Sequence, residues 1–249
     1  MKSAVSRGVV VVSVMATLGF AAGCSDGDGG GGGKKPSKSA EAGTPSAEGK
    51  LESAALAAGD VKKYKLEKES AGSAGEARRP AGPVHPAECR PLSEMLKAAA
   101  PPKAKAHVSR VLSSTDVADT TATEVVLFAY GQADAEKTMD TLRTATKSKK
   151  CATFGEGGRR YFGVRPQPAR GGGDEAVSYK LANRSGEFID RSRVTVVRSG
   201  STLIAFRAAS VFDPEPVQAD EESGDGMTAD PKVSDAIVDA QLAKLAGAK

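Results

Sequence analysis

The chain has 249 residues and a formal net charge of +4, of which Lys2 and Arg7 in the N-terminal segment contribute two. The remaining charge of about +2 gives no reason to expect a nucleic acid partner or strong attraction to anionic lipid. Trp is absent and aromatic residues make up 4% of the chain, so a core must rest on Val, Leu, Ile and Ala.

The N-terminus has the features of a bacterial export signal. Lys2 and Arg7 supply a positive start, and residues 8–20 form an apolar run that suits the hydrophobic part of a signal peptide. The run is too short to span a membrane, which needs roughly 20 apolar residues. We therefore expect a signal for export rather than a transmembrane helix.

Small residues at positions 21–23 lead directly to Cys24. This pattern resembles the bacterial lipobox, in which the cysteine thiol is lipidated and the preceding peptide bond is cut, although Ala21 stands where Leu is preferred. We expect residues 1–23 to be a lipoprotein signal peptide. We expect Cys24 to carry the lipid, and this lipid to include a palmitate group. The alternative is an ordinary secretory signal, which would leave Cys24 as a free thiol.

Residues 24–50 follow as a Gly/Ser/Lys/Pro-rich stretch that cannot build a core. We expect a flexible tether with an average reach of roughly 30 Å. It would hold residues 51–249, enough for one domain, at the extracellular face of the cell membrane. The composition, rich in Ala, Gly, Arg and Val, is typical of actinobacteria.

The cysteine count favours one disulfide bond. If Cys24 takes the lipid, Cys89 and Cys151 remain as a pair in an oxidising compartment. Their bond would close a loop of about 60 residues, worth roughly 4 kcal/mol in the chain-entropy model. A zinc site or a catalytic thiol is the alternative, but further Cys or His ligands at close spacing are missing.

Hydrophobic periodicity and turn residues predict an alternation of helices and strands in the first part of the domain. We expect a helix at 51–58, a strand at 61–67, a loop at 70–86, a helix at 87–99, strands at 107–113 and 123–130, and a helix at 132–147.

In the second part of the domain, the same sequence patterns predict mostly strands. We expect a loop at 155–173 with a short strand at 160–165, strands at 174–182, 188–198 and 201–209, an acidic linker at 213–232 and a helix at 233–246. Ser199-Gly200 favours a tight hairpin. The fold class is therefore α+β, an antiparallel sheet with helices packed on it, one disulfide, and a disordered N-terminal signal and tether.

This order of elements resembles the PknH-like extracellular sensor domains of actinobacterial lipoproteins and receptor kinases. The resemblance rests on Cys89, the helix at 133–146, Cys151 and the Arg-Val-Thr-Val-Val-Arg-Ser-Gly hairpin at 193–200. It implies an extracellular domain with a ligand-binding cleft between sheet and helices, and it carries over no catalytic residue. Family members commonly have two disulfides, whereas this chain can form one.

Motifs for catalysis or for a cofactor are not evident. His85 and His107 lack metal-ligand spacing to other residues, apart from Glu88 three positions after His85. No nucleophile elbow, Ser-x-x-Lys context or phosphate-binding loop appears. We expect no cofactor, no bound metal and no enzymatic activity.

Four arginines gather in one predicted loop, together with Tyr161 and Phe162. Such a loop could hold a phosphate, a carboxylate or an acidic patch of a partner. The alternative is a soluble basic loop, held by the acidic segment near Glu221. The candidate residues are Arg159, Arg160, Arg165 and Arg170.

The leading hypothesis is a membrane-anchored, non-catalytic binding or sensing domain with a small or peptidic ligand. The alternative is a structural or docking lipoprotein that binds an envelope protein and has no small-molecule pocket. A carrier of lipidic molecules or an envelope hydrolase has less support.

Overall fold

A computed structural model describes residues 46–67, 82–97, 101–117, 119, 121–169, 172–212 and 230–248. All of them belong to one compact unit, Thr44–Lys249. The expected signal peptide, Cys24 and nearly all of the tether lie outside the described residues. Arg170 and most of the expected acidic linker lie outside them as well.

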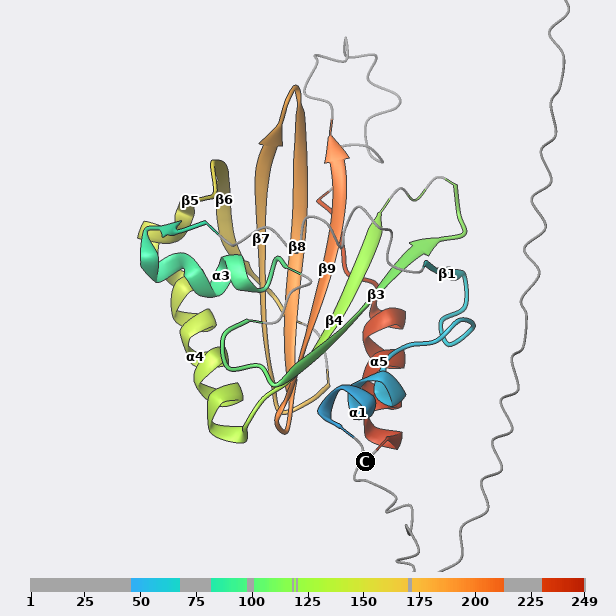
Figure 1. Cartoon of the computed structure of the whole chain (residues 1–249). Helices are drawn as coiled ribbons and strands as arrows, with labels where there is room; N and C mark the ends of the chain where they lie inside the picture. The colour runs from blue at the N-terminus through green and yellow to red at the C-terminus, as the bar shows by residue number, and fades with distance from the viewer. Residues whose placement is uncertain are drawn as a thin grey trace, which may run out of the picture. The chain divides into compact units, whose positions relative to one another are not determined.

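A nine-stranded antiparallel sheet forms the centre of this unit (Figure 1). Across the sheet the strands follow the order β1-β3-β4-β9-β8-β7-β6-β5-β2. The strands are β1 (Tyr64–Glu67), β2 (Val84–His85), β3 (Ala106–Ser114), β4 (Ala122–Ala129), β5 (Thr153–Glu156), β6 (Arg159–Gln167), β7 (Glu175–Ser185), β8 (Phe188–Ser199) and β9 (Thr202–Phe212).

Helices cover both faces of the sheet. On one face lie α1 (Ala47–Ala54) and α5 (Asp235–Gly247), and on the other lie α3 (Arg90–Glu94) and α4 (Gln132–Lys147) (Figure 1). Short 3₁₀ helices flank the second pair, η1 (Ala87–Cys89) before α3 and η2 (Lys149–Ala152) after α4. The predicted α+β class is confirmed.

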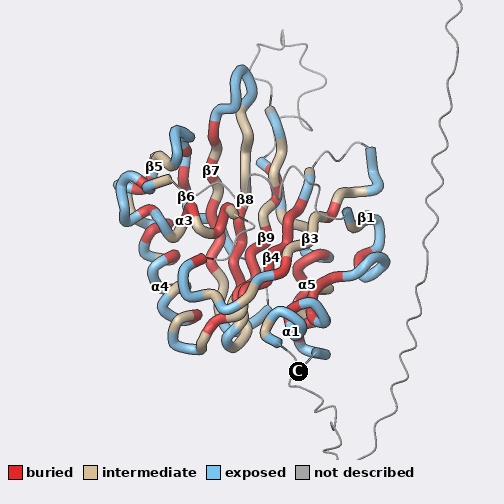
Figure 2. The backbone as a smooth tube through the Cα atoms, viewed as in Figure 1, coloured by how far each residue is buried: buried red, intermediate tan, exposed pale blue. Residues whose placement is uncertain are grey.

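Each face has its own hydrophobic core, and β4 contributes to both. Val125 and Leu127 pack in the core under α1 and α5, whereas Val126 and Phe128 pack in the core under α3 and α4. Successive strand residues point to opposite faces, so a strand covered on both sides needs an unbroken apolar run. Figure 2 shows the buried residues concentrated along the middle strands and on the inner sides of the helices.

Most predicted helices and strands are confirmed, with shifted ends. The helix predicted at 132–147 is α4 residue for residue. Helix α1 starts earlier than predicted because the Ser46 hydroxyl accepts a hydrogen bond from the Gly49 amide (3.1 Å), which caps its N-terminus. The predicted hairpin joins β8 to β9, where Ser199 pairs with Thr202 and Gly200 has φ +59°.

The short strand predicted at 160–165 is confirmed as part of β6, but the rest of the first half of the loop predicted at 155–173 is wrong. Strands β5 and β6 form a hairpin there, and its turn is Gly157-Gly158. Both glycines have positive φ, +56° and +82°, as a type I′ turn requires. The short strand β2 also falls inside a predicted loop, and it pairs with β5.

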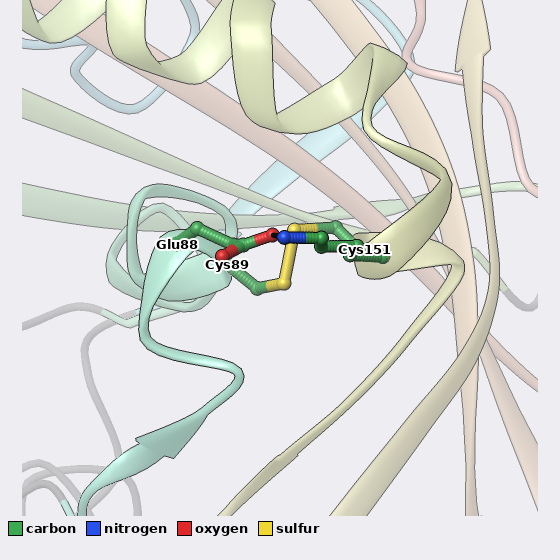
Figure 3. Close-up of a disulfide and its surroundings, with 4 residues drawn as sticks. Glu88, Cys89 and Cys151 are labelled. Atoms are coloured by element: carbon green, nitrogen blue, oxygen red, sulfur yellow. Dashed lines mark ion pairs between the residues drawn. A yellow bond between two sulfur atoms is a disulfide. The ribbon is translucent and has the colours of Figure 1, made fainter.

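The predicted disulfide between Cys89 and Cys151 is present, with an S–S distance of 2.10 Å and a Cα–Cα distance of 5.4 Å. It joins η1 to η2 (Figure 3). Both cysteines are fully buried. Next to the two cysteines in sequence, Lys150 Nζ lies 3.5 Å from Glu88 Oε1. The bond therefore fastens the end of α4 to the start of α3.

Candidate functional site

Helices α1 and α5 cover only part of their face of the sheet. The core beneath them draws its strand residues from β1, β3, β4, β8 and β9, with Ala176 at the start of β7. No described residue of β5 or β6 belongs to this core. The face is therefore left open over β6 and over most of β7.

The charged side chains that strands β6, β7 and β8 turn toward this open area are all positive. Strand pairing places Lys180 of β7 between Arg165 of β6 and Arg193 of β8, and it sets Arg191 opposite Ala182. Residues two apart in a strand share a face. On this face, every charged residue of the described strands β6, β7 and β8 is therefore a cation. We call this set the cationic face: Arg160, Arg165, Lys180, Arg184, Arg191 and Arg193.

A β-bulge brings the β6 arginines to the same face. Between Phe162 and Arg165 the register with β7 shifts by one residue, and Gly163 has φ +65°. Without the shift, Arg160 and Arg165 would point to opposite faces, since they lie five positions apart. The extra residue therefore adds Arg165 to the side that carries Arg160.

Acidic side chains of β7 and β8 lie on the other face and have partners there. Asp190 accepts a hydrogen bond from Asn183 Nδ2 (3.0 Å). Glu175 accepts one from Arg198 Nε (2.6 Å) and pairs with Arg143 of α4. These carboxylates do not neutralise the cationic face.

Two cavities lie on the cationic face. One, of 450 Å³, is lined by Arg165, Lys180 and Arg191 together with Phe162 and Asp230. A neighbouring cavity of 490 Å³ lies against the start of α5. Its lining includes Arg193, Thr195, Lys232, Asp235 and Val238. Both volumes fall in the usual range for small-molecule sites.

The cations of this face are only partly neutralised. Lys180 Nζ pairs with Asp230 Oδ2 at 2.5 Å, and Arg193 donates a hydrogen bond to the carbonyl of Pro168 (3.1 Å). Arg165 makes no ion pair with any described residue, and the same holds for Arg160 and Arg184. A guanidinium group offers parallel N–H donors that match a carboxylate or a phosphate. The arrangement suits an anionic ligand.

The predicted arginine cluster is only partly brought together. Its described members lie on strand β6 rather than in a loop, and Arg159 belongs to the opposite face from Arg160 and Arg165 because of strand alternation. Arg170 lies outside the described residues. Lys180, Arg191 and Arg193 were not predicted as site residues from the sequence. The alternate spacing of Arg191 and Arg193 was a signal for a shared face.

The described residues show no arrangement for catalysis by histidine. His85 lies on β2 and His107 on β3, near opposite edges of the sheet, and neither side chain bonds to another described residue. Within the described ranges no three His, Cys, Asp or Glu side chains form a group that could hold a metal.

One serine has a carboxylate partner, but it is buried. Ser93 Oγ donates to Glu156 Oε2 (2.5 Å), and the same carboxylate pairs with Lys97. Ser93 has no exposed surface, so its hydroxyl has no access to a substrate. It fastens α3 to the end of β5.

The fold and this surface define an α+β domain with one disulfide and an open cationic face. No helix in the described part of the chain has the length and apolar character needed to cross a membrane. No family model matches the chain, and no curated protein matches its sequence.

Solved structures similar to this chain include the extracellular domain of PknH from Mycobacterium tuberculosis. Its TM-score is 0.45 at 12% identity, over 82% of this chain and 97% of that domain. Another is an uncharacterized protein, the Rv0999 ortholog from Mycobacterium smegmatis, with a TM-score of 0.37 at 10% identity over 75% and 89% of the two chains. A PknH extracellular domain is thus among the similar structures, as the sequence resemblance predicted.

Proposed function

We propose that this chain is a lipid-anchored, non-catalytic binding domain of the cell surface, and that it binds an anionic ligand on the cationic face. The observation that carries the proposal is the 450 Å³ cavity lined by Arg165, Lys180 and Arg191. Six cations from three adjacent strands share this face, and the acidic side chains of β7 and β8 are held on the other one.

A binding domain has more support than a docking lipoprotein without a pocket. A docking protein needs an exposed apolar patch of several hundred square ångströms. Among the described residues the exposed large hydrophobic side chains are Val117, Phe188 and Val211, from the β3–β4 connection, the start of β8 and the end of β9. The cavities of the cationic face, by contrast, are of ligand size.

Calorimetry with tripolyphosphate as the probe tests the binding site, using the full mature chain in detergent at low salt. We expect Arg165→Gln and Arg191→Gln each to weaken binding about fivefold, since one lost ion pair at the surface costs roughly 1 kcal/mol. Arg90→Gln is the matched control, because Arg90 is exposed on α3 and lies over the opposite face. Equal affinities for all three variants would contradict the proposed site.

Anchoring is tested by labelling with a radioactive fatty acid in a bacterial host. We expect the full chain to incorporate the label and to partition with membranes, and Cys24→Ser to lose both properties. If the protein is exported and cut but unlabelled, Cys24 is a free thiol and the lipoprotein assignment is wrong.

A further inference from the structure

A third hollow lies on the same face as the cationic cavities, at the edge of the sheet. Its volume is 530 Å³, and its lining includes Pro83, His85, Thr153, Gly155 and Arg160. Pairing places His85 of β2 beside Gly155 of β5, and Gly155 beside Arg160 of β6. His85, Gly155 and Arg160 thus form a row across three strands. Because Gly155 has no side chain, there is an open space in this row between the imidazole of His85 and the guanidinium group of Arg160. We call this the edge hollow.

The edge hollow adjoins the cationic face at β6. Arg160 belongs to both, and the bulge at Gly163 keeps Arg165 on the same side. From β2 to β8 the sheet runs through five neighbouring strands, a distance of roughly 19 Å at the usual strand spacing. The positive groups therefore follow one another across the sheet from Arg160 to Arg191, and the imidazole of His85 lies beyond Arg160 at the edge.

The one carboxylate that lines the edge hollow is already engaged. Glu156 accepts the hydrogen bond of Ser93 and pairs with Lys97 on the α3 side of the sheet. It therefore offers little negative charge to compete for Arg160, which forms no ion pair among the described residues.

We infer that this face binds an elongated polyanion, a linear polymer with repeated phosphate or carboxylate groups, and that the edge hollow is its outer subsite. The inference rests on the proposed function and specifies its ligand. A single small anion would fill one cavity, whereas a row of cavities about 19 Å long matches a chain of negative groups. Linked contacts of this kind raise affinity well beyond that of one site.

A flat bilayer suits this face less well than a chain does. Helix α5 lies on the same side of the sheet, and its residues Asp235 and Val238 form one wall of the 490 Å³ cavity next to Arg193. The cations of the neighbouring strands therefore lie on the sheet surface at the foot of helix α5. A narrow polymer can reach this sheet surface, whereas the protruding helix keeps a planar membrane away from it.

The experiment compares tripolyphosphate with long-chain polyphosphate, using the full mature chain in detergent. We expect the long chain to bind at least about tenfold more tightly. Arg160→Gln should weaken the long chain roughly fivefold and reduce its salt dependence by about one charge. It should weaken tripolyphosphate by a smaller factor than Arg165→Gln does, because Arg160 does not line the 450 Å³ cavity. Arg90→Gln is again the control for loss of one exposed arginine.

A steric variant separates the hollow from general electrostatics. A Cβ added at Gly155 meets only the Arg159 carbonyl oxygen, at 3.8 Å, so Gly155→Val should fold with an unchanged melting temperature. The valine would occupy the gap between His85 and Arg160, and we expect a several-fold loss of long-chain affinity without loss of charge. Normal long-chain binding by this variant would exclude the edge hollow as a subsite.

The remaining outcomes are distinguishable. If tripolyphosphate and the long chain bind equally well, and both depend on Arg165, the proposed function stands and the elongated ligand is wrong. If neither binds, both proposals fail. If vesicles of phosphatidylglycerol, but not of phosphatidylcholine, compete fully with the long chain, the face meets a membrane and the polymer is overturned.

Discussion

Gly163 determines which face of the sheet receives Arg165. It adopts φ +65°, a left-handed conformation that costs most residues roughly 1–2 kcal/mol but costs glycine little. The bulge inserts one residue into β6, and this reverses the alternation for everything that follows. A single glycine thus gathers two arginines on one surface.

Tyr130 is a second residue whose environment is unusual. Its hydroxyl is buried and has no hydrogen-bond partner among the described residues, and burial raises its pKa, so that it stays neutral. We expect Tyr130→Phe to keep the free energy of unfolding or raise it by up to about 1 kcal/mol, because it removes an unsatisfied polar group. Urea unfolding measures the difference.

Tyr179 is the matched control for this variant. It is also buried, but its hydroxyl donates a hydrogen bond to the carbonyl of Leu92 at 2.9 Å. Tyr179→Phe should therefore lower the free energy of unfolding by about 1–2 kcal/mol. If both substitutions destabilise equally, the Tyr130 hydroxyl has a partner after all.

At the scale of elements, helix α4 is held to the sheet by an ionic network in addition to its apolar stripe. Arg143 of α4 pairs with Glu175 at the start of β7, and Arg198 of β8 reaches Glu175 and Asp174 at 2.6 and 2.8 Å. Asp174 also accepts the amide of Gly200 (2.7 Å), so the network includes the β8–β9 turn. It joins a helix to two strands that are distant from it in sequence.

This network makes stability depend on pH. Burial raises the pKa of Glu175, but hydrogen bonds from Arg198 and Arg143 outweigh it and hold the pKa below its ordinary value. The folded state therefore binds this proton less readily than the unfolded state does. The carboxylate stabilises the fold above the unfolded-state pKa, and this contribution is lost as pH falls through the folded-state pKa.

We expect Glu175→Gln to lower the free energy of unfolding by about 1 kcal/mol at pH 7, and by much less at about pH 3. Denaturant unfolding at the two pH values measures the change. Glu187→Gln, in the exposed β7–β8 turn, should have no effect at either pH. A loss for Glu175→Gln that is the same at both pH values would mean that packing, not charge, is responsible.

For the molecule as a whole, the sheet separates two cores, and the disulfide secures one of them. Cys89 and Cys151 both belong to the core under α3 and α4, and they close a loop of 62 residues. The loop contains β3, β4 and α4, so the bond restrains a large part of the unfolded chain. The other core, under α1 and α5, contains no cysteine among its described members.

We expect removal of this bond to cost about 4 kcal/mol of stability, as the chain-entropy model gives for a loop of this length. Guanidinium unfolding with and without reductant measures the cost. The double variant Cys89→Ser, Cys151→Ser should match the reduced protein and respond no further to reductant. An unchanged unfolding midpoint after full reduction would contradict the expectation.

Local patterns in the sequence predicted a large part of the fold. Helix α4 follows from its apolar stripe and the β8–β9 hairpin from its turn, because both signals lie within a few residues. The pairing of Cys89 with Cys151 follows from the count of cysteines and is present. Lipidation at Cys24 and the tether stay predictions from the same kind of local pattern.

Only the tertiary structure decided the candidate site. It depends on strand neighbours, which place β6 beside β7 and β8 and bring β2 to the edge next to β5. Such strand pairing cannot be predicted from a short segment of the sequence, because the register is set by the cores on both faces and by turns that are far apart in sequence. The sequence by itself determined which residues are arginines and which elements carry them. The bulge at Gly163 and the partial cover by α5 then decided which of them share an open face, because side-chain direction in a sheet alternates with every residue.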